Sequence, residues 1–242
     1  MRIGFDMDGV LADFEAAFRD VEARLFGSAG AVAAGPPETA AAGADDEDDV
    51  TGTEAEPDEE AIAAGRLAAA REERRRRVAV WRAIRATPNF WESLAPIDEG
   101  AVRRIHELML RHRWEVFFIT QRPATEGDTV QRQTQRWLVR HGFDLPSVLV
   151  VAGRRGLAAA ALQLDYHVDD NSQNCLDLIA DSKARPILIL PRGDAATAIG
   201  ARQLGILTVA AIGEALDVLE KTSTARSEPG LLARIAEAVG WK

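Results

Sequence analysis

From about residue 99 onward the sequence alternates between short apolar runs and longer amphipathic stretches, and this alternation limits the fold more than any other feature. Apolar runs that predict β-strands lie at residues 114–120, 147–151, 166–169, 186–190 and 206–210. Stretches with helical periodicity lie around and between them, at residues 99–112, 128–141, 156–164, 172–181, 195–204 and 214–221. Strands that alternate with helices form a parallel sheet covered on both faces, so the sequence predicts an α/β fold.

The first 98 residues have a different organisation. Residues 1–6 predict a strand, and residues 11–26 predict a helix with apolar side chains three and four positions apart. Large apolar side chains almost disappear between residues 28 and 60, so this segment cannot bury enough surface to offset the entropy of ordering it. We interpret it as a flexible acidic insert. A helix is predicted to resume at residue 59 and to run to residue 86, before Pro88.

Charge and composition exclude several classes of protein. The net charge is −9, but residues 28–65 hold eleven acidic residues and no Lys or Arg, so the rest of the chain is nearly neutral at +2. A binding surface for a nucleic-acid polymer is therefore not expected. The chain has a single cysteine, Cys175, no apolar leader and no run of ~20 apolar residues, so we expect a soluble protein of the reducing cytoplasm.

Acidic residues follow two of the predicted strands. Asp6 and Asp8 come at the end of the first strand with Gly9 after them, and Asp169 and Asp170 end the strand at 166–169. Ligands of open parallel sheets bind beyond the carboxyl ends of the strands, where these side chains would meet. A solvated turn is the alternative for the first pair. Helix capping is the alternative for Asp170.

Four carboxylates at one sheet edge would repel each other, and a cation would relieve that repulsion. Magnesium fits, because it takes carboxylate oxygens, waters and the oxygens of a substrate phosphate. Thr120 ends the strand at 114–120 and offers a hydroxyl for a phosphate oxygen. Arg154 or Arg155 offers the positive charge that phosphoryl transfer needs, although a strand-terminal Thr without a ligand and a solvated Arg pair are the alternatives.

These segments resemble the motifs of a known family. Residues 5–14, Phe-Asp-Met-Asp-Gly-Val-Leu-Ala-Asp-Phe, resemble the first motif of the haloacid dehalogenase (HAD) superfamily and are similar to its 5′(3′)-deoxyribonucleotidase branch. Ile119-Thr120 resembles the second motif, and Val168-Asp169-Asp170-Asn171 resembles the fourth. The resemblance implies a Rossmannoid core at residues 1–14 and 96–221, a small helical cap at residues 15–95 inserted after the first strand, and a helical C-terminal tail at residues 222–242.

The resemblance also implies roles for single residues. Asp6 would be the nucleophile that becomes an aspartyl phosphate, and Asp8 would be the general acid and then the general base. Magnesium would be held by Asp6, the backbone carbonyl of Asp8, and Asp169, with Asp170 adjacent or alternate. Thr120 would bind the phosphoryl group.

The chain departs from the family pattern at the third motif, where the family has Lys. Arg155 is the replacement that the spacing favours over Arg154. Gln121 is expected to contribute a backbone donor, and Arg122 to bind substrate phosphate or set specificity. Phe90 and Trp91 lie where the nucleotidase branch lines its base pocket. Packing is the alternative for these two rings.

The sequence therefore predicts a magnesium-dependent, 5′-nucleotidase-like HAD phosphatase whose partner is a small phosphorylated substrate and not a membrane. Two alternatives stay open: a phosphatase for a non-nucleotide substrate such as a sugar phosphate, or a binding or regulatory protein with weakened catalysis. The missing Lys and the acidic insert favour the last of these, and the presence of Asp8 speaks against it. The sequence leaves the oligomeric state open.

Overall fold

The structure is a computed structural model that describes residues 1–27, 57–190 and 195–227. The acidic insert predicted at residues 28–60 lies outside the described residues up to residue 56. The predicted C-terminal tail lies outside them from residue 228 onward.

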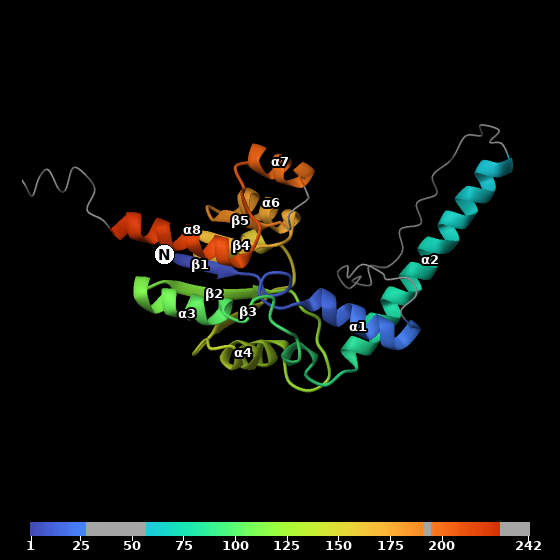
Figure 1. The fold of residues 1–242 in the computed structure, drawn as a ribbon, viewed down its shortest axis with the longest axis horizontal. Helices are drawn as coiled ribbons and strands as arrows, with labels where there is room; N and C mark the ends of the chain where they lie inside the picture. Colours follow the sequence, from blue (N-terminus) through green and yellow to red (C-terminus); the bar gives the residue numbers. More distant parts are fainter. Residues whose placement is uncertain (28–56, 191–194, 228–242) are drawn as a thin grey trace, which may run out of the picture. The chain divides into compact units, whose positions relative to one another are not determined.

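The central element is a six-stranded parallel sheet with the strand order β3-β2-β1-β4-β5-β6 (Figure 1). Every neighbouring pair in it is parallel. The strands are β1 (Arg2–Phe5), β2 (Glu115–Thr120), β3 (Ser147–Val150), β4 (Tyr166–Asp169), β5 (Arg185–Ile189) and β6 (Leu207–Val209). This sheet confirms the predicted Rossmannoid α/β fold.

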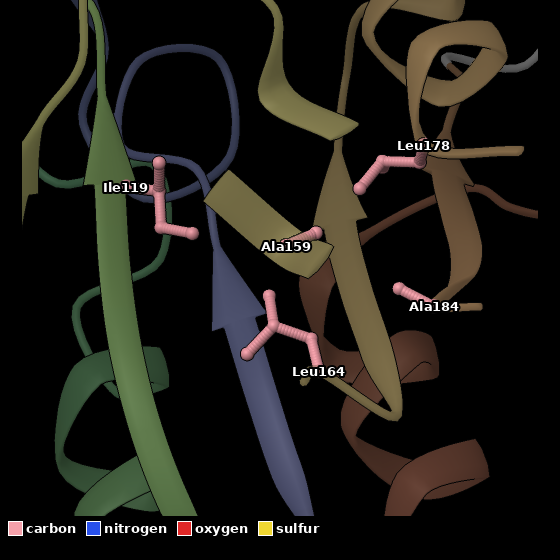
Figure 2. Close-up of a cluster of buried hydrophobic side chains, with 5 residues drawn as sticks. All are labelled: Ile119, Ala159, Leu164, Leu178 and Ala184. Atoms are coloured by element: carbon pink, nitrogen blue, oxygen red, sulfur yellow. The ribbon is translucent and has the colours of Figure 1, made fainter. Parts of the chain in front are cut away.

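Helices alternate with the strands: α3 (Ala101–His112), α4 (Val130–Arg140), α5 (Arg155–Leu162), α6 (Ser172–Asp181), α7 (Ala195–Gln203) and α8 (Ile212–Ser227). Successive side chains of a strand point to opposite faces of the sheet. In β2, Ile119 packs in a cluster with Ala159 of α5 and Leu178 of α6, as Figure 2 shows. Its neighbour Phe118 instead meets the ring of Phe143, at a centroid distance of 4.9 Å. Phe143 in turn contacts His106 of α3, so helices cover both faces.

The observed elements differ from the predicted ones mainly at their ends. Helix α1 begins at Phe14 and not at residue 11, because the chain after Asp6 forms a tight loop in which the backbone N–H groups of Leu11 and Ala12 both donate to the Met7 carbonyl. Helix α8 runs to Ser227, so residues 222–227 belong to it and not to a separate tail. Its extension is supported by Ser223, whose hydroxyl accepts a hydrogen bond from Trp114 Nε1 at 2.8 Å.

Two helices, α1 (Phe14–Phe26) and α2 (Pro57–Arg85), and a short 3-10 helix η1 (Phe90–Glu92) are inserted between β1 and α3. The chain forms two compact units. One contains Met1–Phe14, Trp91–Arg122 and the described residues from Asp128 onward, and the other contains the described residues of Glu15–Phe90 together with Pro123–Gly127.

The second unit has a small core of its own. Phe18 of α1 meets Trp81 of α2 edge to face, at a centroid distance of 5.9 Å. The loop Pro123–Gly127 joins this unit through Glu126, whose N–H donates to the Arg85 carbonyl and whose carbonyl accepts from the Asn89 N–H. The chain thus leaves the sheet unit twice, once after Phe14 and once after Arg122.

The sheet register places three strand ends side by side. Phe5, the last residue of β1, pairs with Phe118 of β2 and with Val168 of β4. From β1 the chain continues to β2 and β3 on one side of it, and then crosses to β4 on the other side. The end of β1 is therefore the switch point of the sheet, where open α/β sheets bind ligands. No helix among the described residues is long and apolar enough to cross a membrane.

The cluster in Figure 2 gives a test of the core. Leu178 is fully buried, so Leu178→Ala is expected to lower the free energy of unfolding by about 2–5 kcal/mol. Its neighbour Ile179 is 44% exposed, and Ile179→Ala is expected to change that free energy by only about 0.5 kcal/mol. Urea unfolding followed by circular dichroism measures both, and equal losses would contradict the packing described.

Candidate active site

The first strand delivers Asp6 to the switch point. Its backbone N–H donates to the Val168 carbonyl at 2.9 Å, so the pairing of β1 with β4 continues through Asp6. The chain then turns sharply through Gly9, which has a φ of +77° that favours glycine. Asp6 is buried, with 4% of its surface exposed, whereas the side chain of the next acid, Asp8, is 24% exposed.

Three acids converge at this point. Each of Asp6, Asp169 and Asp170 offers a carboxylate oxygen, and these oxygens lie within 4.8 Å of one another. The Asp170 carboxylate lies directly against Gly9, since a Cβ at that glycine would be 1.8 Å from Asp170 Oδ2. Three hard oxygen donors at such distances form a set that suits magnesium. The sequence predicted these three ligands, and the structure brings them together.

Asp169 is held in place by three neighbouring groups. The Asn174 side-chain amide donates to its two oxygens at 3.0 and 3.2 Å, and the Asn171 backbone N–H donates to Oδ1 at 3.0 Å. On the other side, His167 Nε2 lies 3.1 Å from Oδ2, and both side chains are fully buried. The carboxylate therefore has a fixed orientation before any ligand binds.

One guanidinium group faces the acids. Arg155 Nη2 lies 2.6 Å from Asp6 Oδ1, and Arg155 Nε lies 3.9 Å from Asp169 Oδ2. Its Nη1 donates to the backbone carbonyl of Ile119 in β2. Arg154 points elsewhere and pairs with Asp181 at 3.1 Å. Of the two arginines that the sequence offered, the structure brings Arg155 to the acids.

The pKa values reflect this crowding. Burial raises the pKa of Asp6 well above its usual value, and the negative charges of Asp169, Asp8 and Asp170 add to that rise, while Arg155 opposes it. The Asp170 side chain is exposed, but local desolvation and the charge of Asp169 raise its pKa to about 7. Burial also acts on Asp169, but the hydrogen bond from His167 and the charge of Arg155 outweigh it and lower its pKa. A cation that neutralised this excess negative charge would reduce the electrostatic repulsion among the carboxylates.

Thr120 lies at the end of β2, next to β1. It is 1% exposed, and its hydroxyl oxygen has no hydrogen-bond partner among the described residues. Buried hydroxyl groups are normally paired, so this one could accept or donate to a ligand oxygen. Its predicted role in binding a phosphoryl group stays a prediction.

The two residues after Thr120 differ in exposure. Gln121 is exposed, whereas Arg122 is buried and pairs with both oxygens of Asp8, at 2.6 and 2.8 Å. Asp8 therefore directs its side chain to Arg122 and not into the acid cluster. The resemblance implies that the backbone carbonyl of Asp8, and not its side chain, binds magnesium, and this stays a prediction. The role of Gln121 as a backbone donor also stays a prediction.

The two aromatic residues predicted to line a base pocket are both buried, Phe90 with 4% and Trp91 with 1% of its surface exposed. The ring of Trp91 contacts that of Phe14 at a centroid distance of 5.6 Å and has the Arg122 guanidinium over it at 4.8 Å. This packing favours the alternative reading of Trp91 as a structural ring, because the contacts that a stacked base would need are already made by protein side chains.

Sequence reasoning missed the residues that support the acids. His167 and Asp169 are two positions apart in β4, so strand alternation already placed them on one face of the sheet. Asn174 lies in the first turn of α6, the helix that follows the strand end, where a short amide side chain can reach back to the carboxylate. No comparable signal linked Arg122 to Asp8, because 114 residues separate them.

Comparisons with known proteins add little to this geometry. No family model matches the chain, and no curated protein matches it. Among solved structures, the chain is similar to a HAD hydrolase, family IA, variant 3, from Entamoeba histolytica HM-1:IMSS, with 12% identity and a TM-score of 0.42. The match covers 88% of this chain and 94% of that one.

Metal binding can be tested without an activity assay. A ligand that binds only the folded protein stabilises it, by about 2.7 kcal/mol at a concentration of 100 times its Kd. We expect magnesium to raise the melting temperature of the wild type, and Asp169→Asn to lose most of this response because it removes a ligand of the cluster. Asp144→Asn makes the same charge change at an exposed residue and should respond like the wild type. An equal response in all three proteins would contradict a metal site at Asp169.

Proposed function

We propose that this protein is a magnesium-dependent phosphomonoester hydrolase of the HAD type that works through an aspartyl phosphate on Asp6. The observation that carries the proposal is the convergence of Asp6, Asp169 and Asp170 at the sheet switch point, opposite the buried guanidinium of Arg155. Asp8 is held apart from this cluster by Arg122, which gives the two acids of the first motif different surroundings.

In the first step, a carboxylate oxygen of Asp6 attacks the phosphorus of the ester. The bond from phosphorus to the ester oxygen breaks, and Asp8 gives a proton to the leaving oxygen, so an alcohol departs. Arg155 lies within ion-pair distance of Asp6 and supplies positive charge where negative charge gathers on the phosphoryl oxygens. The Thr120 hydroxyl is available to orient one of these oxygens.

In the second step, water attacks the phosphorus of the aspartyl phosphate, and Asp8, now a carboxylate, takes the proton from that water. The bond between phosphorus and the Asp6 oxygen breaks, which releases inorganic phosphate and restores the Asp6 carboxylate. Asp8 ends the cycle protonated, as it began, with the proton on an oxygen lone pair that Arg122 does not use. The Asp8 side chain is 24% exposed, so solvent reaches it.

Asp6, Asp169 and Asp170 are the residues that would hold magnesium, together with the backbone carbonyl of Asp8. When bound, the ion supplies charge neutralisation for the phosphoryl group and for the three carboxylates. Asn174 and His167 serve this site indirectly, because they fix the orientation of Asp169.

Nucleoside monophosphates are our first substrate class, on the resemblance of residues 5–14 to the deoxyribonucleotidase branch. Sugar phosphates are the alternative substrate class, because Trp91 is buried and has less surface for stacking on a base than the sequence predicted. A phosphate-release screen over nucleotides, sugar phosphates and phosphorylated amino acids distinguishes these classes. If the protein released phosphate neither from these compounds nor from p-nitrophenyl phosphate, the binding or regulatory alternative would be favoured.

The nucleophile is tested by substitution. Wild-type protein is expected to hydrolyse p-nitrophenyl phosphate with magnesium and to lose this activity in EDTA. Asp6→Asn should reduce turnover below detection, because an amide cannot form the acyl phosphate. Asp144→Asn, at an exposed position, should keep full activity. Most of the activity surviving in Asp6→Asn would show that another group is the nucleophile.

The two adjacent arginines give a matched pair for the charge opposite Asp6. Arg155→Gln should lower kcat by about 100- to 1000-fold, the range found when one electrostatic stabiliser of a transition state is removed. Arg154→Gln breaks only the ion pairs with Asp177 and Asp181 and should leave kcat unchanged. Steady-state kinetics on both variants, with melting temperatures to show that each is folded, measures this difference. Equal losses would contradict the assignment of Arg155.

A further inference from the structure

Arg122 and Asp8 form a closed, two-point ion pair. Arg122 Nη2 donates to Asp8 Oδ1 at 2.6 Å, and Arg122 Nε donates to Asp8 Oδ2 at 2.8 Å. Such side-on pairs between a guanidinium and a carboxylate are strong and fix the plane of the carboxylate as well as its position. Each Asp8 oxygen retains a further lone pair, and the side chain is 24% exposed.

The Arg122 side chain itself has no exposed surface. A phosphate ligand from solution therefore has no access to its guanidinium unless Asp8 is first displaced. Exposure and pairing together argue against the role that the sequence suggested for Arg122, which was to bind the substrate phosphate.

Helix α4 and the ring of Trp91 make further contacts with the Arg122 guanidinium. Arg122 Nη1 donates to Thr134 Oγ1 at 3.0 Å, and that hydroxyl donates to the Val130 carbonyl one turn earlier. The ring of Trp91 lies 4.8 Å from the guanidinium carbon, in cation–π contact. Trp91 is in turn fixed by the residue of α4 that precedes Thr134, because its backbone N–H donates to Gln133 Oε1 at 3.1 Å.

We propose that Arg122 is a positioning residue that fixes the Asp8 carboxylate for both proton transfers, and that Thr134 and Trp91 hold Arg122 in place for this purpose. The proposal rests on the proposed function for the identity of the reaction. Asp8 has to meet two partners in turn, the leaving oxygen and the attacking water, and both transfers need it within hydrogen-bond reach. A carboxylate fixed at two points keeps its remaining lone pairs aimed at one place through both steps.

The kinetic test uses Arg122→Gln and Arg122→Lys with p-nitrophenyl phosphate. A misplaced catalytic group costs on the order of 100-fold in rate, so kcat of Arg122→Gln should fall by about that factor. KM should fall and not rise, because slow hydrolysis makes the aspartyl phosphate accumulate. Arg122→Lys keeps the charge but loses the fork, so most of the loss should remain. A large rise in KM with an unchanged kcat would overturn the proposal and make Arg122 a substrate ligand.

A burst experiment separates positioning from a general loss of structure. p-Nitrophenolate leaves without needing a proton, so Asp6 should still be phosphorylated in Arg122→Gln, whereas hydrolysis of the aspartyl phosphate depends on Asp8. Rapid mixing should therefore show a burst of about one equivalent of p-nitrophenolate per enzyme, followed by slow turnover. A proportional loss of both phases would overturn the proposal.

Two further variants calibrate the result. Thr134→Val removes the hydroxyl that accepts from Arg122 and should lower kcat in the same direction but by a smaller factor. Arg136→Gln removes another arginine associated with α4, one whose side chain is 43% exposed and pairs with Glu92 and Asp128, and it should leave kcat and KM unchanged. If Arg122→Gln does not fold, Arg122→Lys and Thr134→Val still decide the question. An unchanged kcat in both of them overturns the proposal.

Crystal structures of the wild type and of Arg122→Gln provide a test that does not depend on activity. The Asp8 carboxylate should have one orientation in the wild type and should lose it in the variant. The same single orientation in both would overturn the proposal. Wild-type protein that hydrolyses no phosphomonoester would refute the proposed function, whereas the crystal structures would still show whether Arg122 fixes the orientation of Asp8.

Discussion

The buried carboxylate of Asp6 is the constraint on which the rest of the site depends. An acid that is 4% exposed and has two further acids within 4.8 Å is unstable as an anion unless positive charge lies beside it. Arg155 provides that charge from the start of α5, and its second contact, to the Ile119 carbonyl, links it to β2. The ends of β1, β2 and β4 are thus joined through one guanidinium. A divalent cation at the acids would complete the same balance of charge.

The sequence predicted the architecture well because the signals for it are local. Strand β4 and helix α6 have the bounds that the apolar pattern indicated, and the acids at the ends of β1 and β4 meet because parallel strands end at the same edge. The errors fall where tertiary contacts outweigh local pattern. Residues 11–13 follow helical periodicity, but Leu11 and Asp13 make backbone hydrogen bonds to Ile97 and Ala95 instead. Helix α8 extends past Lys221, where Ser223 has a partner in Trp114.

The spacing of the motifs favoured Arg155 over Arg154, but the sequence did not reveal the partners of Arg122 and Arg154, for a physical reason. Arg122, Arg154 and Arg155 all follow strands and all carry the same charge, so residue type alone suggests phosphate binding for each. Their surroundings differ in burial and partners: Arg122 is buried beside Asp8, Arg154 pairs with Asp181 at the end of α6, and Arg155 faces Asp6. Pairs of this kind join residues that are far apart in the chain, and no periodicity records them.

The place of β1 in the sheet has a consequence for how the protein is made. This strand is the first to be synthesised, yet it lies in the middle of the sheet, and its neighbours begin only at Glu115 and Tyr166. At the usual rates of translation, β1 must wait on the order of ten seconds before β4 has been made. During that time an apolar segment with unsatisfied ladder hydrogen bonds leaves the ribosome, and closing the sheet around it has to bridge more than half of the chain. The nascent chain therefore carries Asp6 long before Asp169 has been made, and the pairing of β4 with β1 is the step that brings the acids together.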